Sequence, residues 1–550
     1  MAVFPPRLPA ATAIAVALLA FPSLACGGDG GEAPASPTPT ESGTQTVQST
    51  PTATVQPLAD TFDLSTQSPL FTVYGADAGD LSGGYQALAV GDFNDDGRQD
   101  LLIGAAMADG PDNLRRDAGE AYVIFGEADL PSNLDLAEKG PDILILGASP
   151  GDSLGRTVLA ADLNDDGVDD IIVGAPGVTA GEDPRTDQGR TYVFFGSPDL
   201  KETLDLADET PEYDFVVTGA EGFSRIGDAL ASGDVNGDGV ADLILGAPFA
   251  GRDVGAPPGS VRKEAGEVYV VFGSISLADE VNIAFDEPGF MVSSDQRFGQ
   301  FGAAVAAGDV NGDGTDDVIV GAHLIDVGER EAAGAVYVFF GGSDLSGRRF
   351  IARGEQDAGI LAEAGDNLGL PLASADVNDD GIDDIIAGAR TADGLEDGQP
   401  AAGDIHVLFG RPGLEGDFDL SQGPADLTIR GASAGHLIPT SLALSDVDGD
   451  QAIDIILSAS MGPMERPAAG AIYIISGGAT LQGTVDLATP AHRFAIVGAE
   501  PDDRLGSTIA VVPGDGDSPP KLLVVASDAD GPSNERSNSG EVYLLDLLQR

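Results

Sequence analysis

A nine-residue acidic motif is repeated along most of the chain. At residues 234–242, DVNGDGVAD, Asp or Asn occupies positions 1, 3, 5 and 9, and glycine occupies position 6. Copies begin about 70 residues apart, at Asp92, Asp162, Asp234, Asp309, Asp376, Asp446 and, in a degenerate form, Asp515. Seven such units fill residues 61–550, so the repeats leave no room for a separate catalytic domain.

The rest of each unit consists of short apolar segments separated by turn residues. An apolar run ending in Gly-Ala-Pro or a relative follows the motif, and a Gly-x-x-Tyr segment comes next. Runs rich in Val, Ile, Tyr and Phe, broken by Gly, Pro, Asp and Asn, are typical of β-strands, and no helical period competes. Seven such units predict an all-β fold, a seven-bladed β-propeller. Residues 62–64 are expected to supply an outer strand to the last blade and so close the ring.

The acidic motif has the composition of a calcium-binding loop. Ca²⁺ takes about six to eight oxygen ligands, and short acidic side chains at alternate positions of a tight turn supply them. Positions 1, 3, 5 and 9 offer side-chain oxygens, position 7 offers its backbone carbonyl, and glycine at position 6 permits the turn. All-oxygen ligation disfavours zinc. The motif lacks the Glu at position 12 of an EF-hand, so we expect a loop between two strands of one blade.

Five copies of the motif are intact. Their predicted calcium ligands are Asp92, Asn94, Asp96, Arg98 and Asp100; Asp162, Asn164, Asp166, Val168 and Asp170; Asp234, Asn236, Asp238, Val240 and Asp242; Asp309, Asn311, Asp313, Thr315 and Asp317; and Asp376, Asn378, Asp380, Ile382 and Asp384. Solvated turns are the alternative for any one copy, but five copies in register favour metal sites.

The last two copies depart from the pattern. The sixth offers Asp446, Asp448, Asp450, Ala452 and Asp454, with Gln451 in place of glycine, so we expect a weaker or strained site. The seventh lacks the glycine and is two residues shorter, and we expect no metal there.

The repeat resembles the FG-GAP repeat of the seven-bladed propeller at the head of integrin α subunits and of bacterial relatives. The resemblance is carried by the acidic motif, by Gly-Ala-Pro at residues 174–176 and 246–248, and by Phe-Gly at residues 298–299 and 301–302. It covers residues 61–550 and implies the propeller fold and its calcium loops. It leaves function open, since one fold hosts many functions.

The N-terminal residues have the composition expected of an export signal followed by a spacer. Residues 1–26 combine Arg7, an apolar run and the sequence SLAC, which resembles a lipoprotein signal that ends at Cys26. The apolar run is too short for a permanent membrane span. Residues 27–60 are rich in Gly, Pro, Ser and Thr and predict a disordered tether. The expected product is an exported lipoprotein held at the cell surface or envelope by its N-terminal lipid; plain secretion is the alternative.

The charge excludes one class of partner. The chain has 90 acidic and 27 basic residues, a net charge of −63, so a general nucleic-acid binder is excluded because phosphate contacts need a basic face. Six bound calcium ions would offset part of this charge, and the reason for the remainder is left open.

No catalytic constellation is evident. Two G-x-S-x-G segments, residues 147–151 and 431–435, fall where other units have acidic turn residues, and the four histidines lack metal-ligand spacing. We therefore predict a non-enzymatic, calcium-stabilised surface propeller that binds a protein or glycan, in the manner of adhesion proteins, through its longer inter-strand loops. The alternatives are a calcium-dependent propeller enzyme, such as a polysaccharide lyase or hydrolase, and a purely structural envelope protein.

Overall fold

The computed structural model describes residues 61–547 apart from residues 78, 81–85, 128–130, 180–186, 221–222, 252–264, 276, 278, 394–400, 463–465, 490–493, 515–518 and 535. The predictions for residues 1–26, for Cys26, for the tether and for Asp515 lie outside the described residues. All described residues fall in one compact unit.

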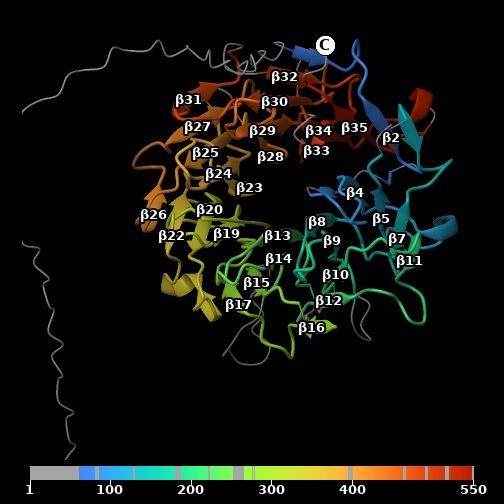
Figure 1. Cartoon of the computed structure of the whole chain (residues 1–550). Helices are drawn as coiled ribbons and strands as arrows, with labels where there is room; N and C mark the ends of the chain where they lie inside the picture. Colours follow the sequence, from blue (N-terminus) through green and yellow to red (C-terminus); the bar gives the residue numbers. More distant parts are fainter. Residues whose placement is uncertain are drawn as a thin grey trace, which may run out of the picture. The chain divides into compact units, whose positions relative to one another are not determined.

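Seven five-stranded sheets follow one another around a ring (Figure 1). The innermost strands contact each other in cyclic order, and the seventh contacts the first, so the sheets are the blades of a seven-bladed propeller. The predicted all-β propeller is thus confirmed. The innermost strands are β3 (Leu88–Gly91), β8 (Thr157–Ala161), β13 (Ala229–Gly233), β18 (Ala304–Gly308), β23 (Leu368–Ala375), β28 (Leu442–Ser445) and β33 (Leu505–Val512).

The second strand of a blade begins where the acidic motif ends, and the third strand contains the tyrosine of the Gly-x-x-Tyr segment or the residue that replaces it. The second strands are β4 (Asp100–Ala105), β9 (Asp170–Ala175), β14 (Asp242–Ala247), β19 (Asp317–Ala322), β24 (Asp384–Ala389), β29 (Asp454–Ala459) and β34 (Lys521–Ala526). The third strands are β5 (Glu120–Ile124), β10 (Arg190–Phe194), β15 (Glu267–Val271), β20 (Ala335–Phe339), β25 (Asp404–Leu408), β30 (Ala471–Ile475) and β35 (Glu541–Leu545).

The fourth strands continue the antiparallel meander of each blade. They are β7 (Ile143–Leu146), β12 (Phe215–Thr218), β17 (Phe290–Ser293), β22 (Ala358–Leu361), β27 (Leu427–Arg430), β32 (Phe494–Val497) and, for the last blade, β2 (Phe71–Tyr74). Short 3₁₀ turns lie at η1 (Pro111–Asn113), η2 (Ile351–Arg353) and η4 (Pro532–Asn534).

The fifth, outermost strand of each blade belongs to the next part of the chain. β11 lies in sequence between the third and fourth strands of the second blade, but it pairs in parallel with β7 of the first blade. The fifth strands are β11 (Thr203–Asp205), β16 (Glu280–Asn282), β21 (Gly347–Phe350), β26 (Gly416–Asp419), β31 (Gly483–Asp486), β1 (Thr61–Asp63) and β6 (Asn133–Asp135).

The first two strands pair with the end of the chain at two places. β2 is antiparallel to β35, where Phe71 faces Leu544, and so becomes the fourth strand of the last blade. β1, which contains the start of the FDL segment, pairs in parallel with β32 of the sixth blade. The outer strand expected for the last blade from residues 62–64 is therefore placed one blade earlier.

The apolar core lies between neighbouring blades. Five of the seven second strands are the segment Asp-x-x-x-Gly-Ala, and they are buried along their whole length because both faces pack against other sheets. Full burial of a Val, Leu or Ile side chain stabilises the folded state by about 1.5–3 kcal/mol. These contacts explain the continuous apolar runs of the sequence.

The glycines of the repeat mark close approaches between blades. A Cβ on Gly246 would lie 2.1 Å from the carbonyl oxygen of Gly302. Phe301, which precedes Gly302, is fully buried between the third and fourth blades. The Phe301-Gly302 pair is thus a packing device, whereas Phe298 of the other Phe-Gly pair is 54% exposed.

Candidate metal loops and the opposite face of the propeller

Each described acidic loop joins the first and second strands of its blade, as expected. In the third blade, the Asp234 carboxylate accepts hydrogen bonds from the N–H groups of Gly237 (2.8 Å), Asp238 (3.0 Å) and Gly239 (2.8 Å). The bonds from positions 5 and 6 to position 1 recur in all six described loops. Gly239 has φ of 91°, which is the left-handed conformation that glycine permits.

The Asp at position 9 opens the second strand and is fully buried in all six loops. In the first loop, Asp100 accepts hydrogen bonds from the N–H of Phe93 at 3.1 Å and from the N–H of Gly126, just after the third strand, at 2.8 Å. Burial raises the pKa of Asp100 to about 6, and that of Asp170, Asp242, Asp317, Asp384 and Asp454 to about 7. A cation beside these carboxylates would favour their charged form.

Position 3 separates the sixth loop from the others. In the third, fourth and fifth loops this residue is Asn, and its side-chain N–H₂ donates to the Asp at position 9, as from Asn236 to Asp242 at 3.1 Å. The sixth loop has Asp448 here, which cannot donate; its Oδ2 instead accepts a hydrogen bond from Ser476 at 2.9 Å. In the sixth loop, the neutral amide that donates to the buried Asp at position 9 is thus replaced by the carboxyl group of Asp448.

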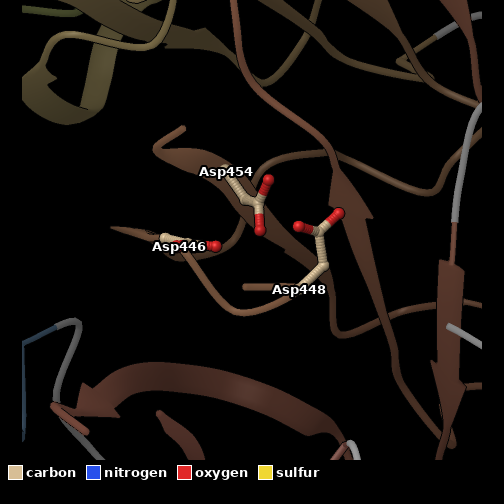
Figure 2. A group of neighbouring side chains, drawn as sticks. All are labelled: Asp446, Asp448 and Asp454. Carbon is tan, nitrogen blue, oxygen red and sulfur yellow. The ribbon is translucent and has the colours of Figure 1, made fainter. Parts of the chain in front are cut away.

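Three carboxylates of the sixth loop face a common space (Figure 2). One oxygen each of Asp446, Asp448 and Asp454 lies within 4.8 Å of the other two. Two oxygens bound to one calcium ion at about 2.3–2.6 Å can be no more than about 5 Å apart. The donor set is all oxygen and the spacing suits Ca²⁺, so the residues of this loop fit the predicted ion.

The other predicted ligands are brought to the same face but are not gathered as closely. Within the described part of the chain, Asp446, Asp448 and Asp454 form the one group of three acidic side chains at this spacing. In the other five loops, the acids at positions 1, 5 and 9 do not meet it. The N–H of position 7 donates to the acid at position 5 in all six loops. Gln451 has φ of 77°, a strained conformation for a residue with a side chain.

Some acidic loops also contact the loop of the next blade. The N–H of Asp234 donates to Asp316 Oδ2 at 2.9 Å, and the N–H of Asp316 donates back to the carbonyl of Asp234 at 3.2 Å. The same exchange joins Asp92 to Asp169 and Asp309 to Asp383. These hydrogen bonds tie the backbone of one acidic loop to that of the next.

The longer inter-strand loops lie at the other end of the strands, on the face opposite the acidic loops. They connect second strands to third strands, as residues 106–119 connect β4 to β5. Five of the exposed large apolar side chains lie on loops of this face: Met107, Leu114, Phe223, Phe298 and Met461. Met107 and Leu114 lie on one of the longer loops predicted to form contact surfaces, whereas Phe223 and Phe298 lie on connections from fourth to first strands, which the prediction did not include.

Two of these side chains, Phe223 and Phe298, occupy the same place in successive repeats. Their φ angles are 70° and 63°, and they are 56% and 54% exposed. Glycine stands at the corresponding position in other repeats, including Gly151 and Gly365, also with positive φ. A bulky residue in this conformation costs about 1–2 kcal/mol. Aligning the repeats would have revealed this substitution from sequence.

The two G-x-S-x-G segments are turns between blades. The N–H of Ser149 donates to Asp152 Oδ2 at 2.8 Å, and β8 follows rather than a helix. The strand-to-helix context of a hydrolase nucleophile is therefore missing at this site.

The fold and its acidic loops define a class: a seven-bladed propeller with an acidic hairpin loop between the first two strands of its blades. The chain carries FG-GAP repeats, since the FG-GAP repeat model matches residues 84–124, 154–194, 226–271 and 301–339. Each match contains an acidic loop and its two strands.

Curated relatives share this repeat region. Phosphatidylinositol-glycan-specific phospholipase D of Homo sapiens is 26% identical over 460 residues, 78% of this chain and 50% of the relative. Integrin alpha pat-2 of Caenorhabditis elegans is 33% identical over 240 residues, 43% of this chain and 18% of the relative. Integrin alpha-5 of Xenopus laevis is 28% identical over 244 residues, 44% and 20% respectively. The chain thus spans half the length of the human phospholipase, and the resemblance to integrin α is confirmed.

Among the residues that the structure describes, no helix has the length and apolar character needed to cross a bilayer.

Proposed function

We propose that the chain is an exported, calcium-stabilised propeller that binds a protein or glycan partner through the face opposite its acidic loops. The proposal divides the molecule into two ends. One end holds the acidic loops and serves stability; the other presents loops whose sequences differ from blade to blade. Loops on a rigid scaffold are where binding usually occurs.

Calcium is proposed at the acidic loops because of their donor set. Asp446, Asp448 and Asp454 bring three carboxylates together, and the donors that reach them are neutral backbone N–H groups and the Ser476 hydroxyl rather than cationic side chains. Like charges at this spacing repel unless a cation or proton intervenes. The proposed role is structural, since each loop ties the first two strands of a blade together.

The binding role is carried by one observation, the exposed pair Phe223 and Phe298. Each residue has a strained backbone conformation and a side chain that is more than half exposed, so neither stabilises the fold as a buried core residue does. Strain of this kind is retained mainly where surrounding structure or function requires it. Two aromatic side chains at equivalent places of successive repeats offer an apolar contact surface for a partner.

The binding proposal is tested with the full chain on a glycan array and, in parallel, on a protein microarray. The double variant Phe223→Gly, Phe298→Gly should lose the bound signal. Glycine removes about 1–2 kcal/mol of strain at each site and costs about 0.5–1 kcal/mol of backbone entropy, so the unfolding temperature should be unchanged or higher. A loss of binding without loss of stability separates contact from fold.

The matched control is Phe285→Ala, which removes an 86% exposed aromatic from the outer connection after β16. This variant should bind as the parent does. Retained signal in the double variant, or no partner on either array, would contradict the proposal.

Export and anchoring are proposed from residues 1–26. The lipid on Cys26 would hold the propeller at the membrane through the spacer of residues 27–60. Cys26→Ala should move the protein from the membrane fraction to the soluble exported fraction; an unchanged distribution would leave plain export without a lipid, or another anchor.

The proposal treats the chain as a binding protein rather than an enzyme. The phospholipase relative is an enzyme by name, but this chain spans half of that protein. The integrin relatives share the same repeats. Activity of the phospholipase kind is therefore not carried over.

A further inference from the structure

A cavity of about 260 Å³ opens at the propeller axis on the face opposite the acidic loops. Its walls come from the starts of innermost strands and from the ends of second strands in six of the seven blades. Apolar walls are supplied by Pro248, Phe249, Leu370 and Leu372. The charged lining is confined to the second and third blades.

Two arginines share a single carboxylate in this cavity. Arg156 Nε donates to Asp228 Oδ1 at 3.0 Å, and Arg225 Nη2 donates to the same oxygen at 3.4 Å. Asp228 is the one acidic residue among the described lining residues. The lining therefore carries one excess positive charge in a chain whose net charge is −63.

Two polar atoms of the lining residues are buried without a hydrogen-bond partner in the described structure. They are Arg225 Nε and His323 Nδ1. The guanidinium carbon of Arg225 lies over the Phe249 ring, 5.0 Å from its centre. Burial, with a smaller effect of Arg390, lowers the pKa of His323 to about 4, so this ring is neutral at pH 7. A buried polar atom without a partner is costly unless a ligand or water completes it.

The propeller fold does not require these charges. Arg156 and Asp228 occupy equivalent positions, each five residues before the last residue of the innermost strand of its blade. The residues at this position in the other blades are Gln86, Ala303, Leu370, Thr440 and Ser507. At the position of Arg225 the next blade has Gln300, whereas the seventh blade has Arg504, which forms an ion pair with Asp528 at 3.2 Å. The position of Arg156 and Asp228 is uncharged in the other five blades, so the charges in the second and third blades indicate a local role.

We propose that the axial cavity binds a carboxylate group of a protein partner, from an acidic side chain or a chain terminus. The planar guanidinium is suited to carboxylates, and one excess positive charge matches the single charge of one carboxylate group better than the double charge of one phosphate group. The apolar walls suit the aliphatic stem of an amino acid better than a hydroxylated sugar. This inference rests on the proposed function, because it names the chemistry recognised on the same face.

The probe is the dipeptide acetyl-Leu-Glu with a free C-terminus, compared with its side-chain and C-terminal amide, acetyl-Leu-Gln-NH₂. Binding to the full chain is measured by ligand-observed NMR titration. Arg156→Gln and Arg225→Gln copy the residues found at these places in other blades, Gln86 and Gln300, so both should fold. Each should weaken the affinity for the free acid about tenfold, the loss of one charge-assisted contact.

Asp228→Ala introduces the residue found at the equivalent position of the fourth blade, Ala303. It should change the affinity in the opposite direction to the two arginine variants. It removes the carboxylate that both guanidinium groups contact, so the affinity for acetyl-Leu-Glu should rise several-fold. The matched control, Arg353→Gln, removes an exposed arginine from η2 and should leave the affinity unchanged.

The proposal is overturned if acetyl-Leu-Glu does not bind, if the diamide binds equally well, or if glucuronic acid binds and the peptide does not. None of these three results contradicts the proposed function if the arrays detect a partner whose binding requires Phe223 and Phe298. Conversely, binding of the free acid with the three expected shifts supports the cavity even if the arrays detect no partner.

Discussion

Replacing Asp448 by asparagine should make the calcium-free chain more stable and its response to calcium smaller. Asp448 lies with Asp446 and Asp454 in a group whose oxygens are within 4.8 Å of one another. Two charges at this distance repel by about 3–4 kcal/mol at an effective dielectric constant of 20. Asp446 and Asp448 are partly exposed, so solvent screening reduces the effect to about 1 kcal/mol.

The asparagine also restores a hydrogen bond that other blades already have. In the third blade, Asn236 donates to Asp242 at 3.1 Å, and the introduced amide would stand in the same relation to Asp454. With calcium, the variant offers one charge fewer, and we expect about a tenfold weaker site. The calcium-dependent gain in stability should fall by about 1.4 kcal/mol at saturation.

The assay is calorimetric unfolding of the full chain in EDTA and in millimolar calcium. In EDTA, Asp448→Asn should unfold about 1–2 °C higher than the parent, because 1 kcal/mol moves a large domain by only a few degrees. The difference between the two conditions should shrink. Asp199→Asn, the same charge change at an exposed residue outside the loops, should do neither. A lower unfolding temperature in EDTA, or an unchanged calcium response, would refute the reasoning.

Three further predictions follow from the same structure. Removing calcium from the full chain with EDTA should lower its unfolding temperature, and elemental analysis before removal should count five or six calcium ions per chain; a metal-free protein with an unchanged melt would rule the sites out. Gly246→Ala should destabilise the fold by about 1–3 kcal/mol in denaturant unfolding, because its Cβ would meet the Gly302 carbonyl at 2.1 Å, whereas Gly423→Ala, with open space around it, should not. Burial, with Glu500 close by, raises the pKa of Asp503 to about 7, above the value of about 3.9 in the unfolded chain, so the native state holds this proton more tightly. Its contribution to stability is present below about pH 4 and is lost as the pH rises to about 7, and Asp503→Asn should flatten unfolding free energy against pH over that range while Asp502→Asn should not.

The repeated features of the molecule could be predicted from sequence, because seven copies report the same constraint. The strands and the propeller follow from patterns present in every blade, and the position of the acidic loops between first and second strands follows from a motif present in six of them. The difference at position 3 was visible as Asp448 against Asn236, but its consequence was not. Whether the side chain donates to the buried Asp or joins it as a third acid depends on geometry.

The opposite face was harder to predict for the same reason. Phe223 with Phe298, and Arg156 with Asp228, stand at repeat positions that are filled differently in most other blades, so a search for shared motifs passes over them. Their meaning depends on contacts between blades, such as the bond from Arg156 to Asp228, which joins residues 72 positions apart. Sequence separation of that size hides the pair until the ring brings successive blades together.

Each fifth strand comes from the sequence of the next blade, and this limits which segments can be duplicated or deleted without opening the ring. β11 lies in the second blade's stretch of sequence and completes the first blade, and β16 stands in the same relation to the second. A duplicated or deleted segment preserves the ring only if it carries its own outer strand for the preceding blade and accepts one from the blade that follows. The segment that can be duplicated or deleted is therefore offset in sequence from the five-stranded blade. A deletion bounded by the first and fourth strands of one blade would remove the fifth strand of the preceding blade and leave its own fifth strand without a sheet to join.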